Sequence, residues 1–199
     1  MFYIAVLVSL IDPTFVTDFE SMRFRYVAEQ RYDTSCGLSA VCTLMRTSWG
    51  VAANEDELAL DFVASRSDSR DFTVSLADLR GLLTARGFTT AAYKMTYSQL
   101  EKAVAKYAPV LVHYDKPEGH FALALWADEK DVITADPSDG VLAVGKTDFG
   151  RRWSGYVLLA ALPKTESKSG ELAAAVDQAV ARVRLLDTTA DVIETGLWP

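Results

Sequence analysis

Apolar residues in the first half of the chain recur at intervals of three and four, the spacing that places them on one face of a helix. Each of these segments follows a residue that can cap a helix, and three of the four have a recognisable end. The first runs to Trp49, the third stops at Gly87, and the fourth must end before Pro109. We therefore expect four helices here, which begin after Ser35, Asn54, Ser75 and Thr96.

The second half changes to short β-branched or apolar runs separated by turn residues, which predicts strands. The gaps between the runs are too short for crossover helices, so the sheet should be mostly antiparallel. Helices followed by an antiparallel sheet indicate an α+β fold. The expected strands cover residues 110–114, 120–126, 131–135, 141–144 and 155–162.

The two ends of the chain differ from this body. Residues 1–11 are apolar but too few for a membrane-spanning helix, which needs about 20 residues. We interpret them as a strand or packed segment; an export signal is the alternative, so the choice between a cytoplasmic and an extracytoplasmic location stays open. We expect one domain over 1–163, followed over 164–199 by a polar linker, an amphipathic helix at 171–187 and a tail.

Composition excludes several classes of protein. The 199 residues carry a net charge of -7, which argues against nucleic acid as a partner, because such binding depends on neutralising phosphates. Two cysteines are too few for a disulfide framework. No CxxC or HExxH spacing supports a zinc site, so we expect neither metal nor cofactor.

Cys36 is the candidate nucleophile. It is expected at the N-terminus of a helix, where the helix dipole favours the reactive thiolate and the first backbone N–H groups lack partners. Gly37 removes a side chain where a substrate carbonyl would approach. Gln30, six residues before Cys36, carries an amide that could donate a second hydrogen bond to an oxyanion.

Cys42 is the matched comparison on the same helix. Six residues correspond to about 240° around a helix and about 9 Å along it, so Cys42 should face away from Cys36 and be buried. That separation also excludes a disulfide between them, since bridged Cα atoms lie within about 7 Å.

The general base must be one of two histidines. His120 follows a turn at the start of an expected strand, whereas His113 is expected at a strand end with its ring facing solvent. We favour His120. If the hairpin turns at 127–130, Asp136 comes within diagonal cross-strand reach of His120 and can orient it, with Asp139 as the alternative.

Four motifs together resemble a known family, the bacteriocin-processing, double-glycine cysteine peptidases, or cysteine peptidase family 39, which have a papain-like fold. The resemblance covers roughly residues 24–162, with the motifs in the family's order. It implies a Cys36 nucleophile, a His120 general base and acid, an orienting Asp136 and an oxyanion-hole Gln30. The motifs are QRYDTSCGLSAV (30–41), GHFALAL (119–125), ITADPSDG (133–140) and FGRRWSGYVLL (149–159).

The resemblance also implies a reaction, the cleavage of a leader peptide after a Gly-Gly or Gly-Ala pair. Narrow subsites lined by bulky side chains would select glycine, because any Cβ would clash. The chain contains no long apolar run and no GxxxxGK[ST] motif, so we expect a stand-alone relative rather than a fused transporter. A separate secretion apparatus is a candidate partner.

Two other readings stay open. An acyl transferase of transglutaminase or phytochelatin-synthase type shares the Cys, His, Asp order but passes the acyl group to another acceptor. A leader-binding domain that has lost catalysis is the second, although all four proposed groups are present in the sequence.

Overall fold

The structure is a computed structural model that describes residues 24–66, 73–163, 173–181 and 183–184. Its helices are α3 (Cys36–Thr43), the π-helical turn η2 (Leu44–Ser48), α4 (Glu55–Ala64), α5 (Leu76–Ala85), α6 (Tyr97–Tyr107) and α7 (Lys146–Arg152). Its strands are β1 (Thr89–Lys94), β2 (Val110–Tyr114), β3 (His120–Ala127), β4 (Asp131–Asp136), β5 (Gly140–Gly145) and β6 (Trp153–Ala161).

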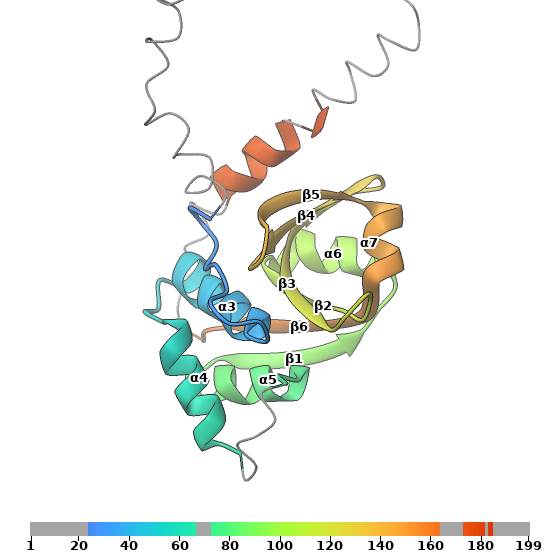
Figure 1. Cartoon of the computed structure of the whole chain (residues 1–199). Coiled ribbons are helices and arrows are strands. Elements are labelled where there is room, and N and C mark those ends of the chain that lie inside the picture. Colours follow the sequence, from blue (N-terminus) through green and yellow to red (C-terminus); the bar gives the residue numbers. More distant parts are fainter. Residues whose placement is uncertain (1–23, 67–72, 164–172, 182, 185–199) are drawn as a thin grey trace, which may run out of the picture.

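All six strands join one antiparallel sheet in the order β1-β6-β2-β3-β4-β5. Helices α3 and α5 contact one face of the sheet, and α6 and α7 contact strands from the other. Figure 1 shows the strands β2 to β5 curling around α6, with α3, α4 and α5 outside this curve. The α+β prediction and the antiparallel sheet are therefore confirmed.

The expected helix starts agree with the structure. Helix α4 is capped by Asn54, whose side chain accepts from the backbone N–H of Glu57 at 2.8 Å. Helix α5 has a capping box between Ser75 and Asp78, and Gly87 after its end has a φ of 85°, which glycine adopts without strain. Helix α6 begins with a capping box between Thr96 and Gln99. Three N-terminal signals therefore identified three helices.

The first helical segment reaches Trp49 as the sequence predicts, but it is not α-helical throughout. Its α-helical hydrogen bonding stops at Thr43 and changes to π-helical over η2 before Trp49. Ser35 occupies the capping position, but its hydroxyl donates to the carbonyl of Tyr32 at 2.7 Å instead of bonding the helix. Ser35 therefore closes the preceding turn.

Two elements were not predicted. Strand β1 is exposed along most of its length and pairs with β6, more than sixty positions later in the chain. Its Thr, Ala, Tyr and Lys residues show no alternation, because an edge strand buries little of either face. Helix α7 has seven residues and one buried side chain, Phe149, so it too leaves a weak pattern.

Buried side chains form two clusters, one on each face of the sheet. The larger contains α3, α4 and α5 with Leu111, Phe121 and Leu123 of the sheet, and the smaller lies around α6 and Phe149. Residues 173–181 are helical, as expected for part of 171–187, and Val176 and Val180 pack with the larger cluster. Residues 1–11 and the linker 164–170 lie outside the described residues.

Within the described part of the chain, no helix combines the length and the apolar character needed to cross a membrane.

Candidate active site

The N-terminus of α3 meets the adjoining ends of β3 and β4 at one cleft, which we call the Cys36 cleft. It has a volume of about 490 Å³, and its walls include Cys36, His120 and Asp136. These three residues are far apart in sequence and are brought together by the packing of α3 on β3 and by the β3–β4 pairing. The structure thus places the proposed nucleophile, base and orienting carboxylate in one site.

His120 interacts with both of the other side chains. The Nε2 atom of His120 lies 2.9 Å from Oδ1 and 3.0 Å from Oδ2 of Asp136. The Cys36 side chain acts on the same imidazole and raises its pKa, and since Nε2 is engaged by Asp136, Nδ1 is the ring nitrogen left to face the sulfur. His120 therefore lies between a thiol and a carboxylate.

This arrangement favours a protonated imidazole. Burial acts to lower the pKa of His120, but the hydrogen bonds and charges of Asp136 and Cys36 outweigh it and raise the pKa to about 9. The Asp136 side chain is only 5% exposed, so water screens its attraction for His120 weakly. A protonated His120 next to Cys36 stabilises the thiolate, the nucleophilic form of cysteine.

Aromatic and cationic groups stack beneath His120. The imidazole lies parallel to the ring of Tyr114, with an interplanar angle of 5° and 6.1 Å between centroids, because the two residues face each other in the β2–β3 register. On Tyr114 itself lies the guanidinium of Arg152, 4.6 Å from the ring centre. Tyr114 is buried and holds the plane of the imidazole by packing.

Cys42 differs from Cys36 in its surroundings, because it does not line the Cys36 cleft. It is 1% exposed in the core, and burial raises the pKa of its thiol to about 12. Both cysteines are free thiols, in agreement with the rejected disulfide. Cys42 is therefore part of the core, as the sequence predicts.

Gln30 is placed beside the Cys36 cleft rather than among its walls. Its backbone N–H donates to the carbonyl of Pro137 at 2.9 Å, and its side-chain oxygen accepts from the hydroxyl of Ser138 at 3.1 Å. The backbone N–H of Ser138 donates to Oδ1 of Asp136 at 2.9 Å. Ser138 thus connects the carboxylate that orients His120 with the proposed oxyanion donor, a connection that sequence analysis missed.

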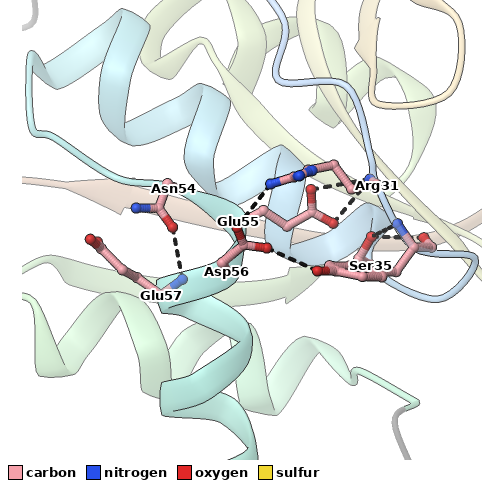
Figure 2. Close-up of polar contacts among 7 residues, drawn as sticks. Arg31, Ser35, Asn54, Glu55, Asp56 and Glu57 are labelled. Carbon is pink, nitrogen blue, oxygen red and sulfur yellow. Dashed lines mark hydrogen bonds and ion pairs between the residues drawn. The ribbon is translucent and has the colours of Figure 1, made fainter.

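The loop between Gln30 and Cys36 is anchored to the start of α4 (Figure 2). Both carboxylate oxygens of Glu55, which is 6% exposed, accept from the backbone N–H of Arg31 at 3.1 Å. Asp56 accepts from the side chains of Arg31 at 2.8 Å and Tyr32 at 3.0 Å. These contacts join residues 24 or 25 positions apart, so no local pattern in the sequence could reveal them.

Two expectations about individual residues were wrong. A Cβ on Gly37 would lie 3.0 Å from side-chain carbons of Leu79 and Phe121, so this glycine makes room for core packing rather than for a substrate carbonyl. The ring of His113 does not face solvent freely: it lies 4.9 Å from the ring of Phe121, bonds Ser154, and forms part of the wall of the Cys36 cleft.

A second, mostly apolar pocket of about 750 Å³ adjoins the cleft. It lies between the loop that precedes Cys36 and helix α4, with Leu38, Phe62 and Val63 among its walls. Asp33, Thr34, Thr73 and Val74 line both the pocket and the cleft, so the two are continuous.

Comparison with curated proteins finds relatives that include proteases. The chain is 24% identical over 144 residues to the probable functional amyloid protease FapD of Pseudomonas aeruginosa, covering 71% of this chain and 63% of that protein. It is 27% identical over 140 residues to an uncharacterized protein of Methanothermobacter thermautotrophicus, covering 69% and 89%. The match with FapD thus spans less than two thirds of that relative's length.

Solved structures share the fold. The peptidase domain of Streptococcus ComA, a bifunctional ABC transporter of a quorum-sensing pathway, superposes with a TM-score of 0.59 at 17% identity, covering 69% of this chain and 98% of that one. A double-glycine motif protease from an AMS/PCAT transporter, solved in complex with a leader peptide, gives a TM-score of 0.55 at 16% identity, covering 70% and 90%.

The family comparison covers both halves of the site. The model of the Peptidase C39 family matches residues 24–165, a span that includes the loop before Cys36, the hairpin of β3 and β4, and the closing strand β6. This chain belongs to the Peptidase C39 family.

Proposed function

We propose that this protein is a cysteine peptidase that cleaves a peptide or leader sequence after small residues of the Gly-Gly type, with Cys36, His120 and Asp136 as catalytic triad. The observation that carries the proposal is that Cys36 lines one cleft together with the hydrogen-bonded pair of His120 and Asp136. Membership of a peptidase family supports it.

The reaction begins with the thiolate of Cys36, which attacks the carbonyl carbon of the scissile peptide bond. The resulting oxyanion accepts hydrogen bonds from the backbone N–H of Cys36, which has no partner within α3 at its first position, and from the NH2 group of Gln30. Protonated His120 then donates its proton to the leaving amine, and the thioester remains on Cys36.

Hydrolysis completes the cycle. His120, now neutral, accepts a proton from water, whose oxygen attacks the thioester and releases the second product. Asp136 keeps the imidazole oriented throughout and stabilises its charged form. The pocket next to the cleft has apolar walls suited to apolar side chains of a bound peptide, as expected for a peptide substrate.

A library of peptides with internal Gly-Gly, Gly-Ala and bulkier pairs tests this proposal, with products identified by mass spectrometry. We expect cleavage after the glycine pairs and no cleavage by Cys36→Ala. Cys42→Ala is the matched control and should cleave, because Cys42 is buried away from the cleft.

Two results would contradict the proposal. Incorporation of an added amine without net cleavage would identify an acyl transferase. Peptide binding without any turnover, combined with a Cys36 that iodoacetamide labels no faster than Cys42, would identify a binding domain.

A further inference from the structure

His113 is a second histidine in the wall of the Cys36 cleft, and the proposed reaction does not use it. It lies on β2 opposite Phe121 of β3, and the rings of the two residues are 4.9 Å apart. Phe121 in turn lies against Gly37, the residue after the nucleophile. His113 is thus separated from the N-terminus of α3 by a single side chain.

Its hydrogen bonds determine which ring nitrogen carries the proton. The hydroxyl of Ser154 donates to the carbonyl oxygen of His113 at 2.8 Å, and a hydroxyl has one proton to give. The hydroxyl oxygen of Ser154 also lies 3.0 Å from Nδ1 of His113. Since its one proton is already donated, it must accept in this second contact. Nδ1 therefore bears the hydrogen, and Nε2 of the neutral ring carries a lone pair.

The Nε2 edge is open toward the 115–119 turn that precedes β3. In the described part of the chain Nε2 makes no hydrogen bond, and Gly119 lies close to it without a side chain, since a Cβ there would lie 3.7 Å from Nε2. Glycine leaves that edge uncovered. Burial lowers the pKa of His113, more than the nearby carboxylate of Asp115 raises it, which maintains the neutral ring with its acceptor.

We propose that Nε2 of His113 accepts a hydrogen bond from a backbone N–H of the peptide substrate and so makes His113 a substrate-binding residue. This inference rests on the proposed peptidase function. An extended peptide in the cleft must bond its own N–H groups, and those facing this wall meet an uncovered acceptor. Because backbone N–H groups are common to all sequences, His113 contributes affinity and alignment rather than side-chain selection.

Two substitutions distinguish the role of Nε2 from that of Nδ1. An Asn side chain at position 113 places a polar group near the position of Nδ1, so it can still bond Ser154, but it places no atom at the position of Nε2. A Gln side chain is longer, and its amide oxygen reaches the position of Nε2. With the best-cleaved Gly-Gly peptide of the library, His113→Asn should lower kcat/KM roughly 3- to 10-fold, the worth of one hydrogen bond, mainly through KM. His113→Gln should recover part of the loss.

N-methylation of single backbone amides in that peptide removes the proposed donor, and combining it with His113→Asn gives a double-mutant cycle. One methylated position should weaken cleavage by the native protein and cause no further loss in His113→Asn. Iodoacetamide labelling of Cys36, which needs no peptide subsite, should proceed at the native rate in His113→Asn.

The inference is overturned if His113→Asn cleaves like the native protein, or if every methylated peptide loses the same fraction of kcat/KM in both proteins. It is also overturned if His113→Asn slows the labelling of Cys36, since His113 would then act on the triad. If the native protein cleaves no peptide at all, the proposed function fails first and the inference with it.

Discussion

At the scale of single residues, the chemistry of the site depends on the charge state of His120. Burial lowers the pKa of His120, but the carboxylate of Asp136, which bonds the ring, and the Cys36 side chain raise it to about 9. The raised pKa therefore depends on these two partners. This balance predicts how pH and substitution affect activity.

Replacing Asp136 with Asn should shift the alkaline limb of kcat/KM to lower pH. The limb reports loss of the imidazolium proton, which the native carboxylate delays to a pH of about 9. Without that carboxylate, burial is less opposed and the pKa of His120 falls. A pH–rate profile measures the shift. Asp139→Asn is the control, because Asp139 also lines the cleft but is not among the groups that raise the pKa of His120; an equal shift there would contradict the assignment.

The same raised pKa makes folding stability depend on pH. Because the pKa of His120 lies higher in the folded than in the unfolded chain, its contribution is complete below the unfolded value of about 6.5. It is lost as pH rises through about 9. Urea unfolding of native protein and His120→Ala should therefore differ more at pH 6 than at pH 10.

Ser138 should act on catalysis only through Gln30. Its hydroxyl holds the side-chain oxygen of Gln30 and leaves the NH2 group to the proposed oxyanion. We expect Ser138→Ala to lower kcat about 3- to 10-fold, since one neutral hydrogen bond is lost. Gln30→Ala alone should lower kcat by roughly 10- to 1000-fold. In that background Ser138→Ala should lower kcat no further. Additive losses in the double variant would exclude this coupling.

At the scale of elements, the position of Cys36 depends on how closely α3 approaches its neighbours. Gly37 lies where α3 meets Leu79 of α5 and Phe121 of β3, and its missing side chain allows that contact. Glu55 at the start of α4 restrains the loop on the other side of Cys36 (Figure 2). The nucleophile is therefore held from both directions along the chain.

Gly37→Ala and Gly81→Ala form a matched pair. A Cβ at 37 would lie 3.0 Å from two buried side-chain carbons, so overpacking should lower the free energy of unfolding by about 1–3 kcal/mol. At Gly81 in α5 nothing lies within 4 Å, and alanine should raise it by about 0.5–1 kcal/mol through helix propensity. Urea denaturation measures both, and a neutral Gly37→Ala would disprove the packing role.

At the scale of the whole molecule, the sheet joins parts of the chain that are distant in sequence. Strand β6 lies between β1 and β2, so the last strand of the chain pairs with the edge strand β1 on one side and with β2 on the other (Figure 1). Beyond it, the helical residues 173–181 pack with the larger cluster rather than standing apart. We propose that this segment is an accessory helix docked on the peptidase domain of 1–163.

Val180→Asp tests that docking. Val180 packs against the larger cluster, so a carboxylate there would lose apolar contact and become partly desolvated, lowering the free energy of unfolding by about 1–3 kcal/mol. Gln178→Asp is the control on the exposed side of the same segment and should change little. Equal unfolding midpoints for the two variants would show that the helix is not docked.

Local sequence patterns were sufficient to predict a structural element wherever its physical cause lies in neighbouring residues. Capping residues located α4, α5 and α6, apolar runs located β2 to β6, and a helix start after Ser35 placed Cys36 at the N-terminus of a helix. We expected a hairpin that turns at 127–130 to bring Asp136 near His120. The observed pairing of Leu123 with Ala135 agrees with that register, because a short turn determines the register of its strands. The bulge between Ala124 and Trp126 shifts that register closer to the turn.

Only the tertiary structure decided what depends on contacts across the chain. The anchoring of Arg31 by Glu55, the bond between Ser138 and Gln30, and the placement of the His113 ring in the cleft each join residues at least 24 positions apart. Edge strand β1 exists because β6 pairs with it. Residue type and spacing determine which groups can react, but packing decides which of them meet, since a cleft is formed by surfaces that the sequence separates.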